Sequence, residues 1–250
     1  PFISVRCLSK PAPLVQGVLH QSLTYDGGEM TPSSPVERST HPTPDPEWLT
    51  AARPVPYETA LAFMESRSGA IAEGSEGECV WLLEHPSLYT AGTSADPAEL
   101  VDPTRFPVFQ TGRGGRFTYH GPGQRVAYVM LNLNKRGCDV RRFVTGLEDW
   151  LLATLAALGV AGERSDSGIG VFVGQAKIAS IGVRIRRWIT LHGVSLNVAP
   201  NLEHFSGIVP CGLHDTPATS LEELGVETDM AKVDAALRES FGHVFGQIQG

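Results

Sequence analysis

Apolar and polar positions along this chain follow two different periods. In three stretches the apolar residues recur every three or four positions, which is the spacing of a helix with one buried face. The stretches that predict helices in this way are 57–72, 140–158 and 230–248. Asp139 precedes the second stretch as a candidate N-cap, and Gly159 follows it as a candidate stop signal.

Short apolar runs between these stretches predict β-strands. The expected strands cover residues 79–84, 107–111, 124–133, 170–173, 176–186 and 188–198. Gly174 and Gln175 join two of them in the manner of a tight hairpin, and a short helix is expected over 219–225. Because strands and helices mix without strict alternation, we expect an α+β fold, a mixed sheet with helices packed on one face.

Residues 1–46 differ in composition from the rest of the chain. They are rich in proline, serine and threonine and show no sustained apolar period. A segment of this kind cannot bury enough apolar surface to offset its ordering entropy. We therefore expect a disordered extension over 1–46 and a single folded domain over 47–250. The first internal methionine is Met30, and we expect the natural start of the protein near that residue.

Composition and charge exclude several classes of protein. The chain has 250 residues, 42% of them hydrophobic, and a net charge of −7. No apolar stretch approaches the ~20 residues that span a bilayer, and the acidic balance argues against wrapping nucleic acid. The start also lacks a signal-peptide pattern. We therefore expect a soluble cytoplasmic protein with no membrane or nucleic-acid partner.

One segment, 113–124, combines four glycines with two arginines, hydroxyl groups and an imidazole. Ordered glycine costs backbone entropy, so a run this dense suggests a backbone that approaches a ligand closely. The alternative is an ordinary glycine-rich surface turn. Because an apolar strand candidate follows at once, we expect the loop to be held against the edge of a sheet and to bind a ligand.

Lysine is scarce in this chain, and Lys177 stands within an expected strand. With a period of two, its side chain is expected on the more apolar face of that strand. The same face carries Ala179, Ile181, Val183 and Ile185. Desolvation destabilises an ammonium group relative to the neutral amine, so a lysine in such a place can act as a general base. The alternative is an ammonium group that reaches water from the nearby turn.

The four cysteines are scattered and form no C-x-x-C pair, so neither a structural zinc site nor a disulfide framework is expected. Cys211 lies between a proline and a glycine in a rigid turn, with no carboxylate close upstream to oppose a thiolate. We rank it first as a candidate nucleophile. Cys138 ranks second, because it precedes a helix but adjoins Asp139, and Cys79 is interpreted as strand core.

Other titratable and charged side chains leave alternatives open. His120, in the glycine-rich segment, and His192, in an expected strand, are alternative bases for a cysteine. Arg184, Arg186 and Arg187 form a basic cluster in an acidic chain. Such a cluster is either a solvated strand end or a docking point for an acidic protein that delivers the substrate.

Four blocks of the sequence occur in an order that is typical of one family. They are L-L-E-H-P-S-L-Y-T-A-G at 82–92, R-G-G-R-F-T-Y-H-G-P-G-Q at 113–124, A-K-I-A-S-I-G-V-R-I-R-R at 176–187 with T-L-H-G-V-S-L-N-V following, and I-V-P-C-G-L at 208–213. Together they resemble the lipoyl(octanoyl) transferases. The resemblance runs from about Trp48 to the C-terminus, so residues 47–250 would be the octanoyltransferase catalytic domain. It implies the fold shared by the catalytic domains of lipoate and biotin protein ligases.

The resemblance also implies an activity. A cytoplasmic enzyme of lipoate biosynthesis would move an octanoyl group from octanoyl-acyl carrier protein to a lysine of a lipoyl domain. The acceptors would be 2-oxoacid dehydrogenases and the glycine-cleavage H protein. No metal, ATP or other cofactor is implied, because a thioester is already activated. The family's nucleophile, which carries the acyl-thioester intermediate, falls on Cys211, and its general base falls on Lys177.

Substrate-binding positions of the family fall on three segments of this chain. They are Arg113, Gly114, Gly115, Arg116, Phe117, Thr118, Tyr119 and His120; Ser180, Ile181 and Gly182; and Gly193, Val194 and Ser195. Some members carry leucine at the position of Ile181 and alanine at that of Ser195. These differences are expected to tune the acyl pocket and to leave the chemistry intact.

Three other functions remain alternatives. An ATP-dependent lipoate or biotin protein ligase would adenylate a free acid and would not need Cys211. A non-catalytic module that binds acyl chains or docks a carrier would be largely unaffected by alkylation of Cys211. A cysteine hydrolase that uses His120 or His192 would release free octanoate without an acceptor lysine.

Overall fold

The computed structural model describes residues 45–165, 168–209, 216–226 and 229–246. All of these residues belong to one structural unit. Nearly all of the extension predicted over 1–46, and the predicted nucleophile Cys211, lie outside the described residues.

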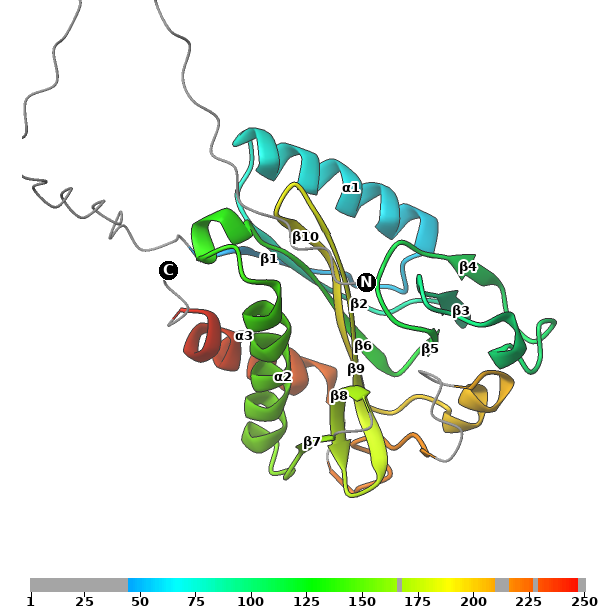
Figure 1. Cartoon of the computed structure of the whole chain (residues 1–250). Helices are drawn as coiled ribbons and strands as arrows, with labels where there is room; N and C mark the ends of the chain where they lie inside the picture. Colours follow the sequence, from blue (N-terminus) through cyan, green and yellow to red (C-terminus); the bar gives the residue numbers. More distant parts are fainter. Residues whose placement is uncertain (1–44, 166–167, 210–215, 227–228, 247–250) are drawn as a thin grey trace, which may run out of the picture. The chain divides into compact units, whose positions relative to one another are not determined.

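A seven-stranded sheet forms the centre of the structure, with the strand order β1-β2-β6-β10-β9-β8-β7 (Figure 1). Its strands are β1 (Glu47–Thr50), β2 (Cys79–Leu83), β6 (Gln124–Met130), β7 (Glu163–Ser165), β8 (Gly168–Val173), β9 (Ala176–Arg186) and β10 (Ile189–Asn197). β1 and β2 run parallel, and the other neighbours run antiparallel. The hairpin of β9 and β10 places Ser180 opposite Ser195.

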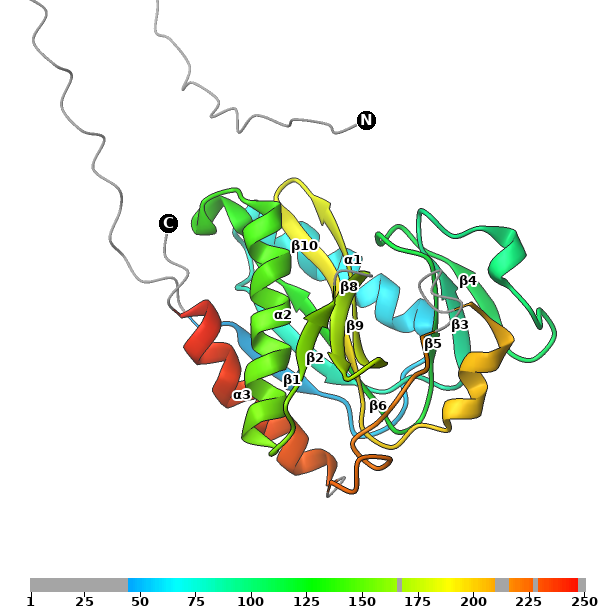
Figure 2. The same cartoon turned by 60° about the horizontal axis from the view of Figure 1, so that its bottom comes forward.

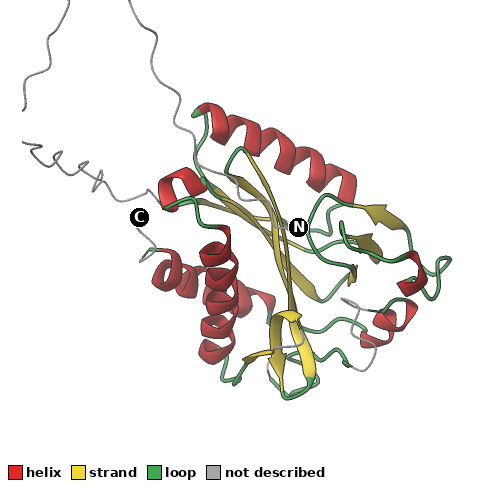
Figure 3. Ribbon diagram, in the orientation of Figure 1, coloured by secondary structure: helices red, strands yellow, loops and turns green. Residues whose placement is uncertain are grey.

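Helices cover both faces of this sheet. They are α1 (Tyr57–Glu73), α2 (Val140–Ala157) and α3 (Met230–Phe245). α2 and α3 pack with alternate residues of β6 such as Ala127 and Val129, whereas α1 packs with Val126 and Tyr128. Figure 3 shows α1 across the sheet from α2 and α3. The expectation that helices pack on one face is therefore wrong. Every residue of β6 is buried, which requires a cover on each side.

A smaller sheet lies beside the central one, with the order β4-β3-β5. Its strands are β3 (Leu88–Ala91), β4 (Val108–Gln110) and β5 (Phe117–His120), and the 3-10 helices are η1 (Pro97–Glu99), η2 (Leu133–Arg136) and η3 (Leu202–Gly207). An aromatic cluster that includes Tyr89, Tyr119 and Phe205 packs the strands against η3. Figure 2 shows the ribbon of η3 beside this small sheet. This packing fixes the end of the glycine-rich segment.

Most of the predicted elements are confirmed, including all three long helices and the hairpin at Gly174. The Asp139 side chain caps α2 by accepting from the Arg142 backbone N–H at 3.0 Å. The helix predicted over 219–225 is only a turn. Backbone N–H groups of Leu221 and Glu222 donate to the end of β10 and its continuation, at 3.0 Å each, so the segment follows β10 instead of forming a helix. No helix among the described residues combines the length and apolar character required to cross a membrane.

Candidate functional site

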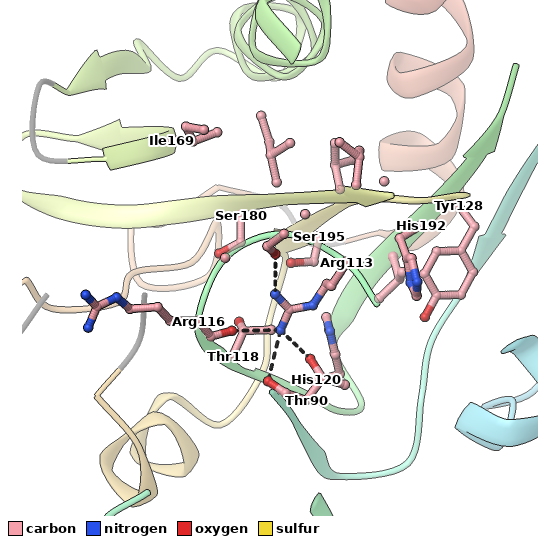
Figure 4. A pocket seen from close by; sticks show the side chains of 18 of the residues that line it. Thr90, Arg113, Arg116, Thr118, His120, Tyr128, Ile169, Ser180, His192 and Ser195 are labelled. Carbon is pink, nitrogen blue, oxygen red and sulfur yellow. Dashed lines mark hydrogen bonds between the residues drawn. The ribbon is translucent and has the colours of Figure 1, made fainter. Parts of the chain in front are cut away.

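A cavity of about 320 Å³ lies between the hairpin of β9 and β10 and the glycine-rich loop (Figure 4). Most of the residues that the sequence predicted for substrate binding line it. They are Arg113, Gly114, Gly115, Arg116, Thr118, His120, Ser180, Ile181, Gly182, Gly193, Val194 and Ser195. Phe117 and Tyr119 instead join the aromatic cluster, because alternate residues of β5 face opposite sides. The structure therefore brings three distant segments around one space.

Arg113 orders the glycine-rich loop from the inside. Its side chain is only 8% exposed, and its guanidinium donates to Thr90 O at 2.9 Å, Thr90 Oγ1 at 2.7 Å, Gly114 O at 2.9 Å and Arg116 O at 3.0 Å. These bonds tie the loop to β3 of the small sheet. The same guanidinium is a positive charge in the cavity wall.

Two glycines are required for this arrangement. Gly115 has φ +88°, in the left-handed region where residues with a side chain are strained. At Gly182 a Cβ atom would approach Arg113 Cδ to 2.8 Å. The missing side chain of Gly182 therefore makes room for the arginine that holds the loop.

Lys177 lies on a different face from the one that the sequence predicted. Between the pairs Val171–Ala179 and Phe172–Lys177, β8 advances by one residue and β9 by two, so Ile178 is the extra residue of a β-bulge. Ile178 and Ala179 both join the core beneath α2, whereas Lys177 pairs with Phe172, on the other side of β8 from Val171. The bulge therefore breaks the period of two, and the predicted face is wrong.

The side chain of Lys177 is buried, with 7% exposure, and its Nζ donates to Ile169 O at 2.9 Å. Nζ also lies 5.5 Å from the centre of the Phe172 ring. Ile169 itself lines the cavity. Lys177 is therefore buried, as the sequence predicted, and its side chain does not extend from the turn into water.

Both ends of the segment that contains Cys211 are anchored near these groups. On one side, the Val209 backbone N–H donates to Glu99 O at 2.8 Å, and the Glu99 side chain pairs with Arg116 of the cavity wall. On the other side, the Lys177 backbone N–H donates to Pro217 O at 2.8 Å. Cys211 falls between these two anchors in the sequence, outside the described residues.

The histidines that the sequence offered as alternative bases are buried, and their basicity is low. Burial, with the neighbouring His85 and Arg113 as smaller causes, lowers the pKa of His120 to about 3. Burial, followed by the charges of Arg113 and Arg184, lowers the pKa of His192 to about 4. Both side chains are neutral at neutral pH and hold an abstracted proton poorly, which counts against a cysteine–histidine hydrolase.

The two described cysteines lie in β2 and just before α2. Cys79 is fully buried in β2, as predicted, and burial raises the pKa of its thiol to about 11. Cys138 precedes α2, and its Sγ contacts Asn134 Oδ1 at 3.5 Å.

Arg187 begins the turn between β9 and β10, and Arg186 beside it is exposed. Within the described ranges, no group of three His, Cys, Asp or Glu side chains is placed to hold a metal ion.

One side of the cavity was not predicted from the sequence. Tyr57 at the start of α1 and Tyr128 in β6 both line it, and His85 lies behind them. His85 Nδ1 donates to Val55 O at 2.6 Å, so its Nε2 accepts from the Tyr128 hydroxyl at 2.7 Å. These residues are far apart in the sequence and share no motif, so only the packing of α1 on β6 brings them together.

Comparisons with known proteins agree with this architecture. Residues 56–242 match the model of the lipoyl protein ligase A/B catalytic domain. An octanoyltransferase of Parvibaculum lavamentivorans is 60% identical over 210 residues, covering 81% of this chain and 93% of that protein. An octanoyltransferase of Chelativorans sp. is 55% identical, covering 82% of this chain and 89% of that protein.

The fold is also found in a solved structure of low sequence identity. A putative lipoate protein ligase from T. acidophilum, solved with bound lipoic acid, superposes with a TM-score of 0.64 at 16% identity, covering 80% of this chain and 86% of that chain. Its likeness confirms the predicted α+β architecture of a mixed sheet with helices. The match of the family model to most of the chain and the high identity of the curated relatives agree. The chain belongs to the lipoyl protein ligase A/B catalytic domain family.

Proposed function

We propose that this protein transfers an octanoyl group from octanoyl-acyl carrier protein to a lysine of a lipoyl domain, through a thioester on Cys211, with Lys177 as the proton carrier. The octanoyl transfer in lipoate biosynthesis is supported by curated octanoyltransferases with 53–60% identity over about four fifths of the chain. The single observation that supports the mechanism is the buried Lys177 amine, which donates to Ile169 of the cavity lining and whose backbone is hydrogen-bonded to the segment that follows Cys211.

In the first half of the reaction, the Cys211 thiol gives its proton to the Lys177 amine. The thiolate attacks the thioester carbonyl carbon, a new carbon–sulfur bond forms, and the bond to the carrier's sulfur breaks. The departing carrier thiolate takes the proton from Lys177. The protein then carries an octanoyl thioester, and the carrier protein is released as a thiol.

In the second half, the amine of the acceptor lysine attacks the same carbonyl carbon. A carbon–nitrogen bond forms while the bond to Cys211 breaks, and Lys177 moves the proton of the attacking amine to the departing thiolate. The products are an octanoyl amide and the free Cys211 thiol. Because the thioester supplies the driving force, neither step needs ATP.

The length of chain between Cys211 and its two anchors is compatible with contact between Cys211 and Lys177. Pro217 is bonded to Lys177, and Cys211 is six residues upstream, a span of at most ~20 Å when fully extended. The other anchor, Val209, is two residues from Cys211 and is tied through Glu99 to the cavity wall. These anchors support the proposal that the nucleophile meets Lys177 at the end of the cavity.

The cavity supports the choice of a medium-length acyl chain. Apolar side chains such as Val126, Val144 and Val183 contribute to its wall. Burial of a methylene group is worth about 0.8 kcal/mol, so each CH₂ of an octanoyl chain adds to discrimination against short acyl groups. We further propose a cytoplasmic location, and lipoyl domains of 2-oxoacid dehydrogenases or the glycine-cleavage H protein as acceptors.

An assay with purified components tests the function directly. Octanoyl-carrier protein and a lipoyl domain, without ATP, should yield an octanoylated lysine in the presence of this protein. Free octanoate with ATP should yield none. Transfer only from free octanoate and ATP would instead identify a ligase, and release of octanoate without an acceptor would identify a hydrolase.

A further inference from the structure

Four buried side-chain atoms among the described residues have no hydrogen-bond partner: Tyr57 Oη, His192 Nε2, Arg125 Nε and Asp234 Oδ1. The last two face each other at 2.8 Å in an ion pair, so their charges compensate. Tyr57 and His192 are different, because each lines the cavity and is only 3% exposed. Among the described residues, Tyr57 and His192 therefore hold the two buried side-chain polar atoms that lack both a hydrogen bond and an ion pair. Both atoms belong to residues that line the cavity.

A core residue rarely tolerates such a state. A buried donor or acceptor without a partner costs about 1–3 kcal/mol. His192 also has φ +61° within β10, a left-handed conformation that is uncommon for a residue with a side chain. Strain and unsatisfied polar atoms that occur together indicate a binding position.

The groups at this position are uncharged at neutral pH. Burial is the main cause that raises the pKa of Tyr57 to about 12 and lowers the pKa of His192 to about 4. The neighbouring Tyr128 hydroxyl already donates to His85 Nε2, so its oxygen can only accept from a guest. A neutral guest that both donates and accepts hydrogen bonds fits these uncharged groups.

The position lies at the far end of the cavity from Lys177. Figure 4 shows Ile169 and Arg116 at one side of the pocket and His192 and Tyr128 at the opposite side, and Lys177 Nζ donates to Ile169 O. His192 pairs with Val183, six residues along β9 from Lys177, a span of about 18–20 Å in a strand. The Lys177 side chain covers part of this span, because it extends past Gly170 to Ile169 O. Three extended residues reach ~10 Å. An extended octanoyl chain has fewer backbone bonds than three residues, so it is shorter than this length.

We infer that the Tyr57–His192 end of the cavity is a hydrogen-bonding subsite for a neutral hydroxyl group, beyond the terminal methyl of an octanoyl chain. The inference rests on the proposed octanoyl transfer. A water molecule fills the subsite when the chain is octanoyl. The terminal hydroxyl of a longer acyl chain replaces the water, so the protein also accepts ω-hydroxyacyl thioesters of about ten carbons.

A matched pair of substrates isolates the hydroxyl. Decanoyl and 10-hydroxydecanoyl thioesters of the same carrier protein are compared by kcat/KM, with octanoyl-carrier protein as the reference. The wild-type protein should use the hydroxylated chain at least as well as the plain one. Tyr57→Phe, which removes only the hydroxyl donor, should lower the ratio of the two kcat/KM values about tenfold. Tyr89→Phe, at a buried tyrosine outside the cavity, should leave the ratio unchanged.

The reference substrate separates the two claims. Loss of octanoyl transfer in the wild-type protein would refute the proposed function itself. Normal octanoyl transfer, combined with rejection of both ten-carbon chains or with a ratio that Tyr57→Phe does not change, would refute the subsite alone. A crystal structure of the octanoyl-protein should show an ordered water within hydrogen-bond distance of Tyr57 Oη, replaced by the substrate hydroxyl with 10-hydroxydecanoyl. An empty apolar space there would contradict the inference.

Discussion

Gln124 and Asn197 meet across the pair β6–β10, where Gln124 Nε2 donates to Asn197 Oδ1 at 2.9 Å. This bond is the middle of a buried chain. His120 Nδ1 donates to Gln124 Oε1 at 2.7 Å, and Asn197 Nδ2 donates to Thr219 O at 2.9 Å. The Thr219 backbone N–H in turn donates to Lys177 O at 3.0 Å. The cavity histidine and the strand of the proposed base are thus linked by amide groups with fixed orientations.

Replacement of Asn197 tests this link. Asn197→Ala leaves Gln124 Nε2 and Thr219 O without these bonds in a buried place, so the free energy of unfolding should fall by roughly 2–4 kcal/mol. Urea unfolding followed by circular dichroism measures the loss. Asn201→Ala is the matched control, because Asn201 is exposed and caps a 3-10 helix, a role worth about 1 kcal/mol. Equal losses of unfolding free energy in the two variants would show that the buried chain of amides stabilises the fold no more than an exposed helix cap does.

Lys177→Met keeps an unbranched side chain but removes the amine that would carry the proton. The rate of octanoyl transfer should fall by about 10²–10⁴-fold, the usual contribution of a general base. Single-turnover kinetics should show the loss both in the formation of the acyl-protein and in its transfer to the acceptor lysine. Lys135→Met, at an exposed lysine of η2, should have no effect. A Lys177→Met protein that is folded and fully active would remove Lys177 from the mechanism.

The pH dependence of stability follows from three buried histidines. Burial is the main cause that lowers the pKa of His85 and His192 to about 4 and that of His120 to about 3, from an ordinary value of 6.5. Between about pH 6.5 and 4, these histidines therefore bind protons in the unfolded chain but stay neutral in the folded chain. The contribution of these neutral histidines to the free energy of unfolding should be greatest above about pH 6.5, and it should fall steadily as the pH drops toward 4.

Urea unfolding between about pH 7.5 and 4.5 measures this slope. His85→Gln, whose amide can still accept from the Tyr128 hydroxyl, should show a shallower slope than the wild-type protein. An identical slope in the two proteins would contradict the assignment of His85 as a neutral buried group.

The exposed Arg186 beside the β9–β10 turn tests carrier docking. If the basic cluster holds an acidic carrier protein, Arg186→Glu should lower kcat/KM for octanoyl-carrier protein several-fold and weaken its dependence on salt. A neutral octanoyl-pantetheine substrate should be used at the wild-type rate. Arg53→Glu, at another exposed arginine, controls for the change in net charge. The same loss with both substrates would mean that the arginine acts on the fold or the cavity instead.

The sequence predicted long elements well because their periods are sustained over many residues. α2, for example, combines a continuous apolar stripe with the Asp139 cap, and both were readable from the chain. The short strands β1, β3, β5 and β7 were not predicted, because so few residues show no clear period; of the strands of three or four residues, only β4 was predicted, within 107–111. Their positions depend on pairing with neighbours that lie far away in the sequence.

The site was predictable in its motifs and unpredictable in its local geometry. Arg113, Gly182 and Ser195 were found through block resemblance, and the structure places all three around the cavity. The face of Lys177 was wrong because one bulge at Ile178 reverses the alternation, and no residue type in the strand marks it. Tyr57 was missed because only the docking of α1 on the sheet brings it to the cavity.

The most direct test of the mechanism is the intact mass of the protein after mixing with octanoyl-carrier protein. We predict the gain of one octanoyl group, mapped by proteolysis to Cys211, lost when a lipoyl domain is added and absent in Cys211→Ser. An octanoyl adduct on Cys138, or octanoyl transfer that proceeds normally in Cys211→Ser, would contradict the account.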